Sequence, residues 1–346
     1  MRTFECDYTE GAHPKILDAL LRTNMEQMSG YGCDPYTARA AQKIQSAIGT
    51  PVSSVTFLVG GTQTNQVVID LLTAPYEGVL TPKTGHINVH EAGAIEFTGH
   101  KVIALAEHDG VLDVDALEAY LVDFYADATY EHMVRPGLVY LTHPTEYGTL
   151  YSKAQVTRIR ALCDRYDMKL YVDGARLGYA LGCPDNDLTL ADLASFADAF
   201  SIGGTKLGLL CGEAAVFTRE TPKALLSQVK RHGALLAKGR VLGVQFDAMF
   251  TDGLYEAIGR EAIRHARRIR EILTRSGYPF AWESPTNQQF VLLNDAEVES
   301  LKRHVGFDLW GRTKDGRWIV RFTSSWSTTD ADVDALEQAL PLKKEL

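Results

Sequence analysis

The amino-acid sequence predicts an α/β fold with a large, mainly parallel sheet domain followed by a small C-terminal α+β domain. The chain has 346 residues, 45% of them hydrophobic, which exceeds the usual size of one domain and suffices for a large core. Up to about residue 250, short apolar runs alternate with helical patterns, as in a parallel sheet covered by helices. The order of elements then changes, so we expect domains over residues 1–250, with an N-terminal arm, and 251–346.

In the first domain, the strand-like runs are short, apolar and bounded by turn residues. Strands are expected at residues 55–59, 102–105, 138–142, 169–172, 199–202 and 212–217. Helical patterns follow three of these runs and extend to residues 72, 124 and 166. This alternation favours parallel pairing, because a crossover helix brings the chain back to the start of the next strand.

The second domain has a different order of helices and strands. A helical pattern over residues 256–274 precedes strand-like runs at 280–282 and 290–293. A helix at 296–304, a strand at 318–322 and a final helix from Asp330 complete the pattern. Mixed elements in this order predict a small α+β unit.

Charge and cysteine content argue against several classes of protein. The formal net charge is −9 and the pI about 5.6, whereas a nucleic-acid binder needs a basic face, so no nucleic-acid partner is expected. Five scattered cysteines without a Cys-x-x-Cys pair speak against a disulfide framework or a zinc site. There is no apolar signal segment and no run of roughly 18 apolar residues that would span a membrane. We therefore expect a cytoplasmic protein without a bound metal or a membrane partner.

Ligands of an open parallel sheet bind beyond the carboxyl ends of its strands. One such segment, Gly60-Gly61-Thr62, leads from a strand into a helix. Glycines let backbone N–H groups approach an anion and the helix N-terminus adds partial positive charge, which suits a phosphate. A plain helix start capped by Thr62 is the other interpretation. The segment is not a Walker loop, because the Gly-Lys-Ser/Thr ending is absent.

Two other strand ends carry charged residues. Asp173 and Arg176 follow the strand at 169–172, and although an isolated Asp-Gly is ordinarily a turn, the apolar run places Asp173 at the ligand edge. Lys206 follows the strand at 199–202 and is surrounded by glycines and leucines, which is unusual for a surface lysine. In an apolar site the pKa of a lysine falls, and the neutral amine needed for a Schiff base becomes available.

Histidines next to loop residues form a further candidate group. His86, His90 and His143 occupy positions where an imidazole can stack on a planar ligand or move protons, although a lone histidine is more often structural. His86 and His90 have the i, i+4 spacing of a metal site on a helix, but Asn88 and nearby glycines argue against a helix there. No metal site is expected.

An acid, a lysine and a phosphate site in this arrangement are the set that pyridoxal 5′-phosphate (PLP) requires. Asp173 would keep the pyridine nitrogen protonated, so that the ring accepts electrons, and Lys206 would carry the aldehyde. Gly61 and Thr62 would hold the phosphate. PLP is therefore the expected cofactor, and a small amino acid the expected substrate.

The set and its order resemble the low-specificity L-threonine aldolase and aromatic β-eliminating lyase family of PLP enzymes, with the aspartate-aminotransferase-like (type I) fold. The resemblance covers nearly the whole chain, and DGARL is its most specific segment. The matching segments are residues 31–35 (YGCDP), 61–63 (GTQ), 90–94 (HEAGA), 142–143 (TH), 173–177 (DGARL), 205–206 (TK) and 321–326 (RFTSSW).

The resemblance implies a role for each matching residue. The expected catalytic residues are Lys206, His86 and His143. The expected cofactor contacts are Gly61, Thr62, His86, Asp173, Arg176, Thr205, Lys206 and Arg240, the last from a partner subunit. The expected substrate contacts are Cys6, Arg176 and Arg321, of which Arg321 is the better candidate for a bidentate bond to the carboxylate. A homodimer or homotetramer with shared active sites is also implied.

The implied reaction is cleavage of the Cα–Cβ bond of L-threonine, L-allo-threonine or a related β-hydroxy-α-amino acid to glycine and an aldehyde. Departures from the family lie on the substrate side, since Cys6 replaces a serine and Tyr8 a threonine in the opening motif. β-Elimination and aldol cleavage of aromatic β-hydroxy amino acids therefore stay open, and a non-catalytic metabolite-binding protein is a distant alternative. His143, Glu91 or a bound water are the candidates for the base at the β-hydroxyl.

Overall fold

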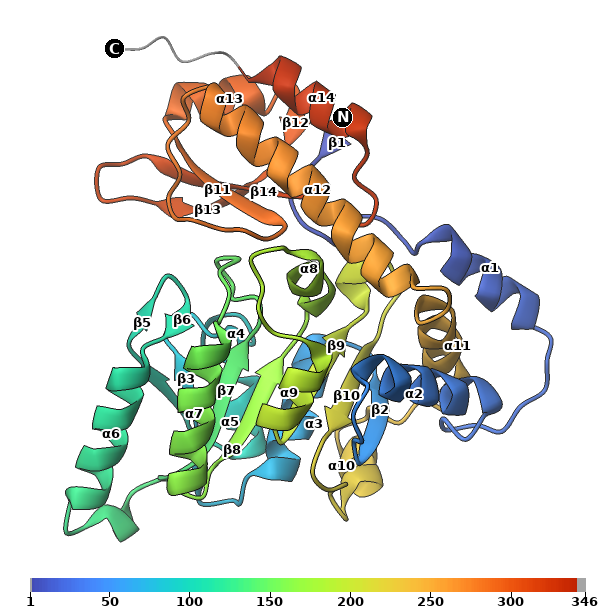
Figure 1. Cartoon of the computed structure of the whole chain (residues 1–346), viewed down its shortest axis with the longest axis vertical. Helices are drawn as coiled ribbons and strands as arrows, with labels where there is room; N and C mark the ends of the chain where they lie inside the picture. Colours follow the sequence, from blue (N-terminus) through green and yellow to red (C-terminus); the bar gives the residue numbers. More distant parts are fainter. Residues whose placement is uncertain (1, 341–346) are drawn as a thin grey trace.

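The computed structural model describes residues 2–340, which form a large lower unit and a small upper unit (Figure 1). The lower unit contains a seven-stranded sheet and the upper unit a three-stranded one. A long helix, α12 (Leu254–Arg275), runs from the lower unit along the upper one. This architecture confirms the predicted α/β class, and the boundary expected at residues 250 and 251 stays a prediction.

The large sheet is parallel except for one strand. In spatial order its strands are β2 (Ser54–Leu58), β10 (Glu213–Phe217), β9 (Ala199–Gly203), β8 (Lys169–Asp173), β7 (Arg135–Thr142), β3 (Glu77–Pro82) and β4 (Val102–Leu105). β10 runs antiparallel to both neighbours. The sequence predicted every one of these strands except β3, whose short apolar run is interrupted by Thr81 and Pro82.

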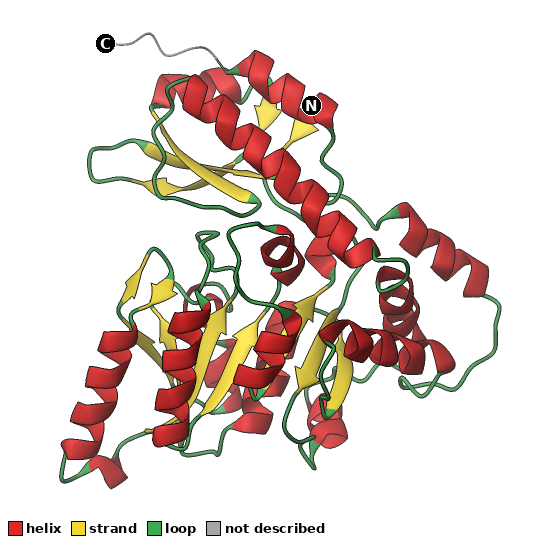
Figure 2. Cartoon of the chain, viewed as in Figure 1, coloured by secondary structure: helices red, strands yellow, loops and turns green. Residues whose placement is uncertain are grey.

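Helices cover both faces of this sheet (Figure 2). Residues of β7 alternate, so that Val139 and Leu141 join one apolar cluster while Leu138 and Tyr140 join the other. The first cluster includes residues of α2 (Pro35–Ile48), α6 (Val114–Ala126), α7 (Lys153–Arg165) and α9 (Leu190–Phe196). The second includes residues of α3 (Gly61–Leu72), α5 (Ala94–Thr98) and α10 (Leu225–Arg231). With both faces covered, the strand ends are left to form a site.

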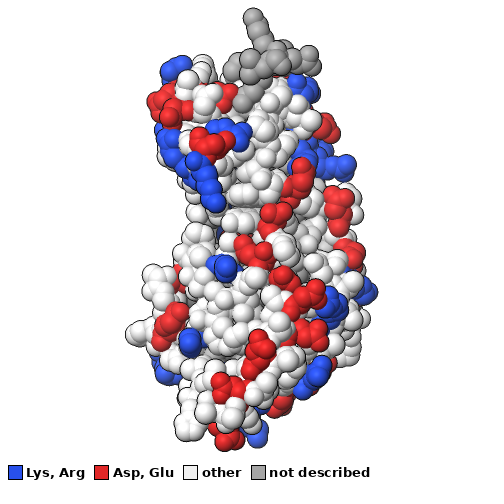
Figure 3. Space-filling model, turned by 90° about the vertical axis from the view of Figure 1, so that its left-hand side faces the viewer, with Lys and Arg blue, Asp and Glu red and all other residues white. Residues whose placement is uncertain are grey.

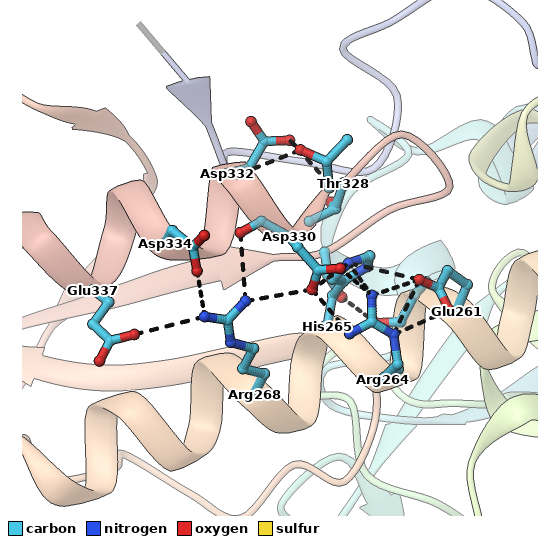
Figure 4. Close-up of polar contacts among 12 residues, drawn as sticks. Glu261, Arg264, His265, Arg268, Thr328, Asp330, Asp332, Asp334 and Glu337 are labelled. Atoms are coloured by element: carbon cyan, nitrogen blue, oxygen red, sulfur yellow. Dashed lines mark hydrogen bonds and ion pairs between the residues drawn. The ribbon is translucent and has the colours of Figure 1, made fainter.

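The upper unit is a small antiparallel sheet packed against helices. Its strands, in spatial order, are β11 (Gln288–Leu293), β14 (Trp318–Thr323) and β13 (Asp308–Arg312), and its helices besides α12 are α13 (Asp295–Leu301) and α14 (Asp330–Ala339). The strand predicted at 280–282 is only a single bridge, between Phe280 and Val291. Ion pairs connect α12 to α14, among them Arg264 to Asp330 at 2.9 Å and Arg268 to Asp334 (Figure 4).

The remaining elements are short or lie outside the two sheets. They are α1 (Pro14–Thr23), α4 (His86–Val89), β5 (Glu107–His108), β6 (Val111–Leu112), the 3₁₀ helices η1 (Tyr130–His132) and η2 (Thr205–Leu207), α8 (Leu177–Gly182) and α11 (Arg240–Met249).

The N-terminal segment joins the two units. Its first strand, β1 (Arg2–Thr3), pairs in parallel with β12 (Val305–Gly306) of the upper unit. Phe4 then packs in the core of the upper unit, while Asp7, a few residues later, is buried beside the lower unit. The segment thereby carries residues to the boundary where the strand ends lie.

The surface carries charges of both signs. On the face shown in Figure 3, lysines and arginines are interspersed with aspartates and glutamates. Among residues 2–340, no helix combines the length and the apolar character needed to cross a membrane.

Candidate active site

A cavity of about 300 Å³ lies at the carboxyl ends of the parallel strands. It brings together most of the residues that the sequence singled out, although they come from four different parts of the chain. Those that line it are Gly61, Thr62, His86, Asp173, Arg176, Thr205 and Lys206. Strand ends of an open α/β sheet are the expected place for a ligand.

Asp173, the last residue of β8, is held in one orientation by four donors, one of which is the Ser201 hydroxyl, 3.5 Å from Oδ1. Its Oδ2 accepts hydrogen bonds from the Tyr140 hydroxyl at 2.7 Å and from the Asn65 amide at 3.0 Å. Its Oδ1 accepts from the N–H of Ala175 at 2.9 Å. The residue is 3% exposed, so a buried, oriented carboxylate faces the cavity.

A chain of hydrogen bonds leads from Asp173 to His86. The Asn65 amide also donates to Glu91 Oε1 at 2.7 Å, and the same oxygen lies 2.7 Å from His86 Nδ1. Burial works to lower the pKa of His86, but the hydrogen bond to Glu91 and the nearby negative charges outweigh it and raise that pKa. The hydrogen bond to Glu91 therefore holds the imidazole in place at the edge of the cavity.

Lys206 lies in η2, directly after β9. Within residues 2–340 its amine has no ion pair or hydrogen bond, while its carbonyl accepts from the Tyr179 hydroxyl at 2.5 Å. Burial, and then the positive charge of Arg176, lower the pKa of the amine. An amine of this kind is suited to act as a nucleophile. The catalytic role expected for Lys206 stays a prediction.

The helix α3 begins at the wall of the cavity, which Gly60, Gly61 and Thr62 line. Its N-cap is Gly60, which is extended and offers no side-chain cap, so Thr62 does not cap the helix. A Cβ built on Gly60 or Gly61 would meet nothing within 4 Å. The first N–H groups of a 12-residue helix thus open into the cavity, as an anion requires.

Arg176 forms an ion pair with Asp7, which the sequence did not predict. Its guanidinium donates to both carboxylate oxygens of Asp7, at 2.7 and 3.1 Å, and Asn287 also donates to Asp7 at 3.0 Å. Burial alone would raise the pKa of Asp7, but the charges of Arg176 and Lys206 lower it. The ion pair holds Arg176 at the cavity wall.

Arg321 and Cys6 lie beside the cavity rather than in its lining. The Arg321 guanidinium contacts Gln288 at 2.9 Å and Asp308 at 2.8 Å, and it lies over the ring of Trp310 at 4.7 Å. Its buried Nε has no hydrogen-bond partner within the described chain. Burial raises the pKa of the half-buried Cys6 thiol, which favours its neutral form.

His143 and Arg240 are not brought to the cavity of their own chain. His143 is 1% exposed, its Nε2 lies 3.1 Å from Asn186 Oδ1, and burial lowers its pKa to about 4. Arg240 donates instead to the carbonyl oxygens of Glu26, at 2.6 Å, and Thr23.

Three acids of the site were missed by sequence reasoning. Glu146 and Glu213 line the cavity, and Asp7 holds Arg176. Glu213 opens the buried strand β10, and an acid at that position was a usable signal. Burial raises the pKa of Glu213 to about 8. Asp7 and Glu146 lie in loops, where no local pattern marks them.

No group of three or more histidine, cysteine, aspartate or glutamate side chains within residues 2–340 is arranged to hold a metal ion. The cavity therefore offers an amine, carboxylates, an imidazole and a helix N-terminus. These groups can bind an anion, form a covalent bond to a carbonyl compound and move protons.

Comparisons with known proteins agree with this geometry. The profile of the beta-eliminating lyase family matches residues 4–296. The solved threonine aldolase of Leishmania major is 39% identical, covers 98% of both chains and superposes with a TM-score of 0.94. The low specificity L-threonine aldolase of Pseudomonas aeruginosa is 29% identical over 94% of this chain and 93% of its own. Serine palmitoyltransferase of Sphingomonas wittichii shares the fold, with a TM-score of 0.72 at 16% identity over 98% of this chain and 86% of its own. This chain therefore belongs to the beta-eliminating lyase family.

Proposed function

We propose that this protein is a PLP-dependent lyase that cleaves the Cα–Cβ bond of L-threonine, L-allo-threonine or a related β-hydroxy-α-amino acid. The products are glycine and an aldehyde. The observation that carries the proposal is that one cavity holds the unpaired Lys206 amine, the Asp173 carboxylate and the open N-terminus of α3. The threonine aldolases among its relatives support the substrate class.

The residues of the cavity fit PLP. The uncapped start of α3 at Gly61 and Thr62, with the Thr205 hydroxyl, would hold the phosphate. Asp173 would bond the pyridine nitrogen and Lys206 would bind the aldehyde covalently. When bound, PLP supplies a ring that takes up the electron pair released at Cα.

His86 would lie against the cofactor ring. Its hydrogen bond to Glu91, at 2.7 Å, would hold the imidazole against the cofactor ring. Arg240 would reach a phosphate only from a partner subunit, because it lies away from the cavity of its own chain.

The substrate carboxylate would bind between two arginines. Arg176 lines the cavity, and the positive charge of Arg176, after burial, contributes to lowering the pKa of Arg321. An anion between them would offset this repulsion and provide a partner for the orphaned Arg321 Nε. Cys6, a neutral thiol near Arg321, takes the place of the serine that the family has there.

The proposed enzyme is a homodimer or homotetramer of the cytoplasm. α1 exposes Leu17 and Leu21, and Met25 follows them at the same spacing, which supports a subunit contact. The five cysteines are all unpaired, which suits a reducing compartment.

Replacement of the lysine tests the proposal. Lys206→Ala should abolish aldehyde release from L-threonine and the visible absorption band of the bound cofactor, because no other amine lines the cavity of the described chain. Lys302→Ala, at the surface of the upper unit, is the matched control. Turnover retained by Lys206→Ala would reject the mechanism. Release of ammonia and a keto acid, instead of glycine and an aldehyde, would reject aldol cleavage.

A further inference from the structure

A second cavity adjoins the first, and one carboxylate lies at their junction. The second cavity, of about 380 Å³, is lined by His90, Tyr147, Leu309 and Trp310 among others. Glu146 lines both cavities, and within residues 2–340 no other residue does so. Glu146 is therefore the residue that a substrate reaching from the first cavity toward the second would meet.

Glu146 is buried, and its carboxylate has no hydrogen-bond or ion-pair partner within residues 2–340. The residue is 6% exposed. Its backbone is held, since the carbonyl accepts from Gln288 at 3.4 Å and the neighbouring Thr145 N–H donates to Thr149 O at 2.9 Å. A free carboxylate on a fixed loop is available to a ligand.

The charge of Glu146 acts on three titratable groups of the two cavities. Its negative charge acts to raise the pKa of His86 and His90 and that of Lys206. His86 lies in α4, His90 directly after it and Lys206 in η2, so the charge of Glu146 acts on groups from separate segments around the two cavities.

The other two side chains considered as the base, His143 and Glu91, line neither cavity. The Nε2 of His143 is occupied by Asn186 at 3.1 Å. The Oε1 of Glu91 is shared by Asn65 and His86. Glu213 lines the first cavity and its Oε2 has no hydrogen-bond partner within residues 2–340, but Glu213 does not line the second cavity. Among the acids of the described chain, only Glu146 lines both cavities.

We propose that Glu146 is the catalytic base that accepts the β-hydroxyl proton, an inference that rests on the proposed function. The O–H bond breaks and its proton goes to a Glu146 carboxylate oxygen, while its electron pair forms the C=O bond of the aldehyde. The Cα–Cβ bond breaks and its electron pair stays with Cα. A proton returned to Cα gives glycine, so the proton lost by the hydroxyl is balanced.

Two reactions of the holoenzyme separate this role from a structural one. Cleavage of L-threonine needs a base at the β-hydroxyl, whereas exchange of a Cα hydrogen of glycine for deuterium does not. Glu146→Gln should lower kcat for aldehyde release by about 10²–10⁴-fold, leave glycine exchange measured by proton NMR unchanged, and leave the melting temperature of the apoprotein unchanged. Glu146→Asp should restore part of the cleavage.

The matched control is Glu118→Gln, which removes a surface carboxylate of α6 and should equal the wild type in both reactions. If Glu146→Gln cleaves threonine at the wild-type rate, the inference is wrong and the proposed function stands. The same holds if this variant loses cleavage and glycine exchange equally. Selective loss of cleavage in His143→Asn, with Glu146→Gln active, would assign the base to His143. A wild-type enzyme that exchanges glycine but releases no aldehyde would overturn the proposed function and the inference with it.

Discussion

At the scale of single residues, the charges around Lys206 are set by acids that lie far apart in the sequence. Asp7 comes from the N-terminal segment and acts to raise the pKa of Arg176 and of Lys206. Glu213 comes from the start of β10, and burial raises its own pKa while the charge of Lys206 acts to lower it. The two acids are 0% and 3% exposed. Removing a buried charge that pairs with another lowers the free energy of unfolding, because the remaining charge stays buried without a partner.

Asp7→Asn should destabilise the protein strongly. The substitution leaves the buried guanidinium of Arg176 without its counter-charge, and loss of one partner of a buried ion pair typically costs about 3–5 kcal/mol. The midpoint of urea unfolding of the apoprotein measures this. Asp18→Asn, in the exposed pair with Arg22, is the control and should shift the midpoint little. Equal shifts for the two variants would contradict the account.

Glu213→Gln should flatten the pH dependence of stability. Burial raises the pKa of this carboxyl from 4.5 to about 8, so the folded state holds its proton more tightly than the unfolded state. Its stabilisation is complete below pH 4.5 and is lost as the pH rises through about 8. The contribution to the slope is at most about 1.4 kcal/mol per pH unit. Denaturation of both apoproteins across this range measures the slopes, and identical slopes would refute the assignment.

At the scale of elements, the backbones of α8 and α12 approach each other closely at glycines. A Cβ on Gly182 would lie 2.5 Å from the backbone of Gly259, and a Cβ on Gly259 would collide with the carbonyl of Gly178. Because these glycines have no side chain, α12 lies directly against α8, the helix that follows Arg176. The ion pairs of Figure 4 are exposed by comparison, and exposed pairs contribute roughly 0–1 kcal/mol each.

Gly259→Ala should therefore destabilise the protein more than the loss of a surface ion pair. Overpacking against fixed backbone costs about 1–3 kcal/mol, because neither helix can yield locally. Thermal unfolding monitored by circular dichroism measures the change. Gly11→Ala, where a Cβ would meet nothing within 4 Å, is the matched control. A Gly259→Ala protein as stable as this control would show that the crossing tolerates a methyl group.

At the scale of the whole molecule, the N-terminal segment ties the two units together and α1 projects from the lower one (Figure 1). Leu17, Leu21 and Met25 are 47%, 76% and 87% exposed. Their spacing of four residues places the two leucines on one face of α1, and a row of exposed apolar side chains is typical of a protein contact.

Leu21→Arg should weaken the proposed oligomer. A charge in the centre of an apolar contact loses its hydration without gaining a partner. Sedimentation velocity should show a smaller species for this variant than for the wild type. Val122→Arg, which changes an exposed residue of α6 outside this row, should leave the assembly unchanged. A wild-type protein that sediments as a monomer would reject the oligomer itself.

Local sequence pattern located most of the large sheet and several residues that line the first cavity. Alternating apolar runs located every strand of the large sheet except β3, and the residues after them include Gly61, Asp173 and Lys206. Because parallel strands end at the same edge, residues at those ends converge whatever the loops do. The sequence by itself therefore determined the fold class and several of the groups that line the first cavity, Gly61, Asp173 and Lys206 among them.

Only the tertiary structure determined the contacts of the residues expected to act on the substrate. Asp7 rather than a ligand holds Arg176, His143 turns toward Asn186, and Glu146 stands between two cavities. Each of these outcomes depends on contacts between loops and between the two units, which are distant in sequence. Such contacts follow from how the units pack, and no periodicity in the chain encodes them.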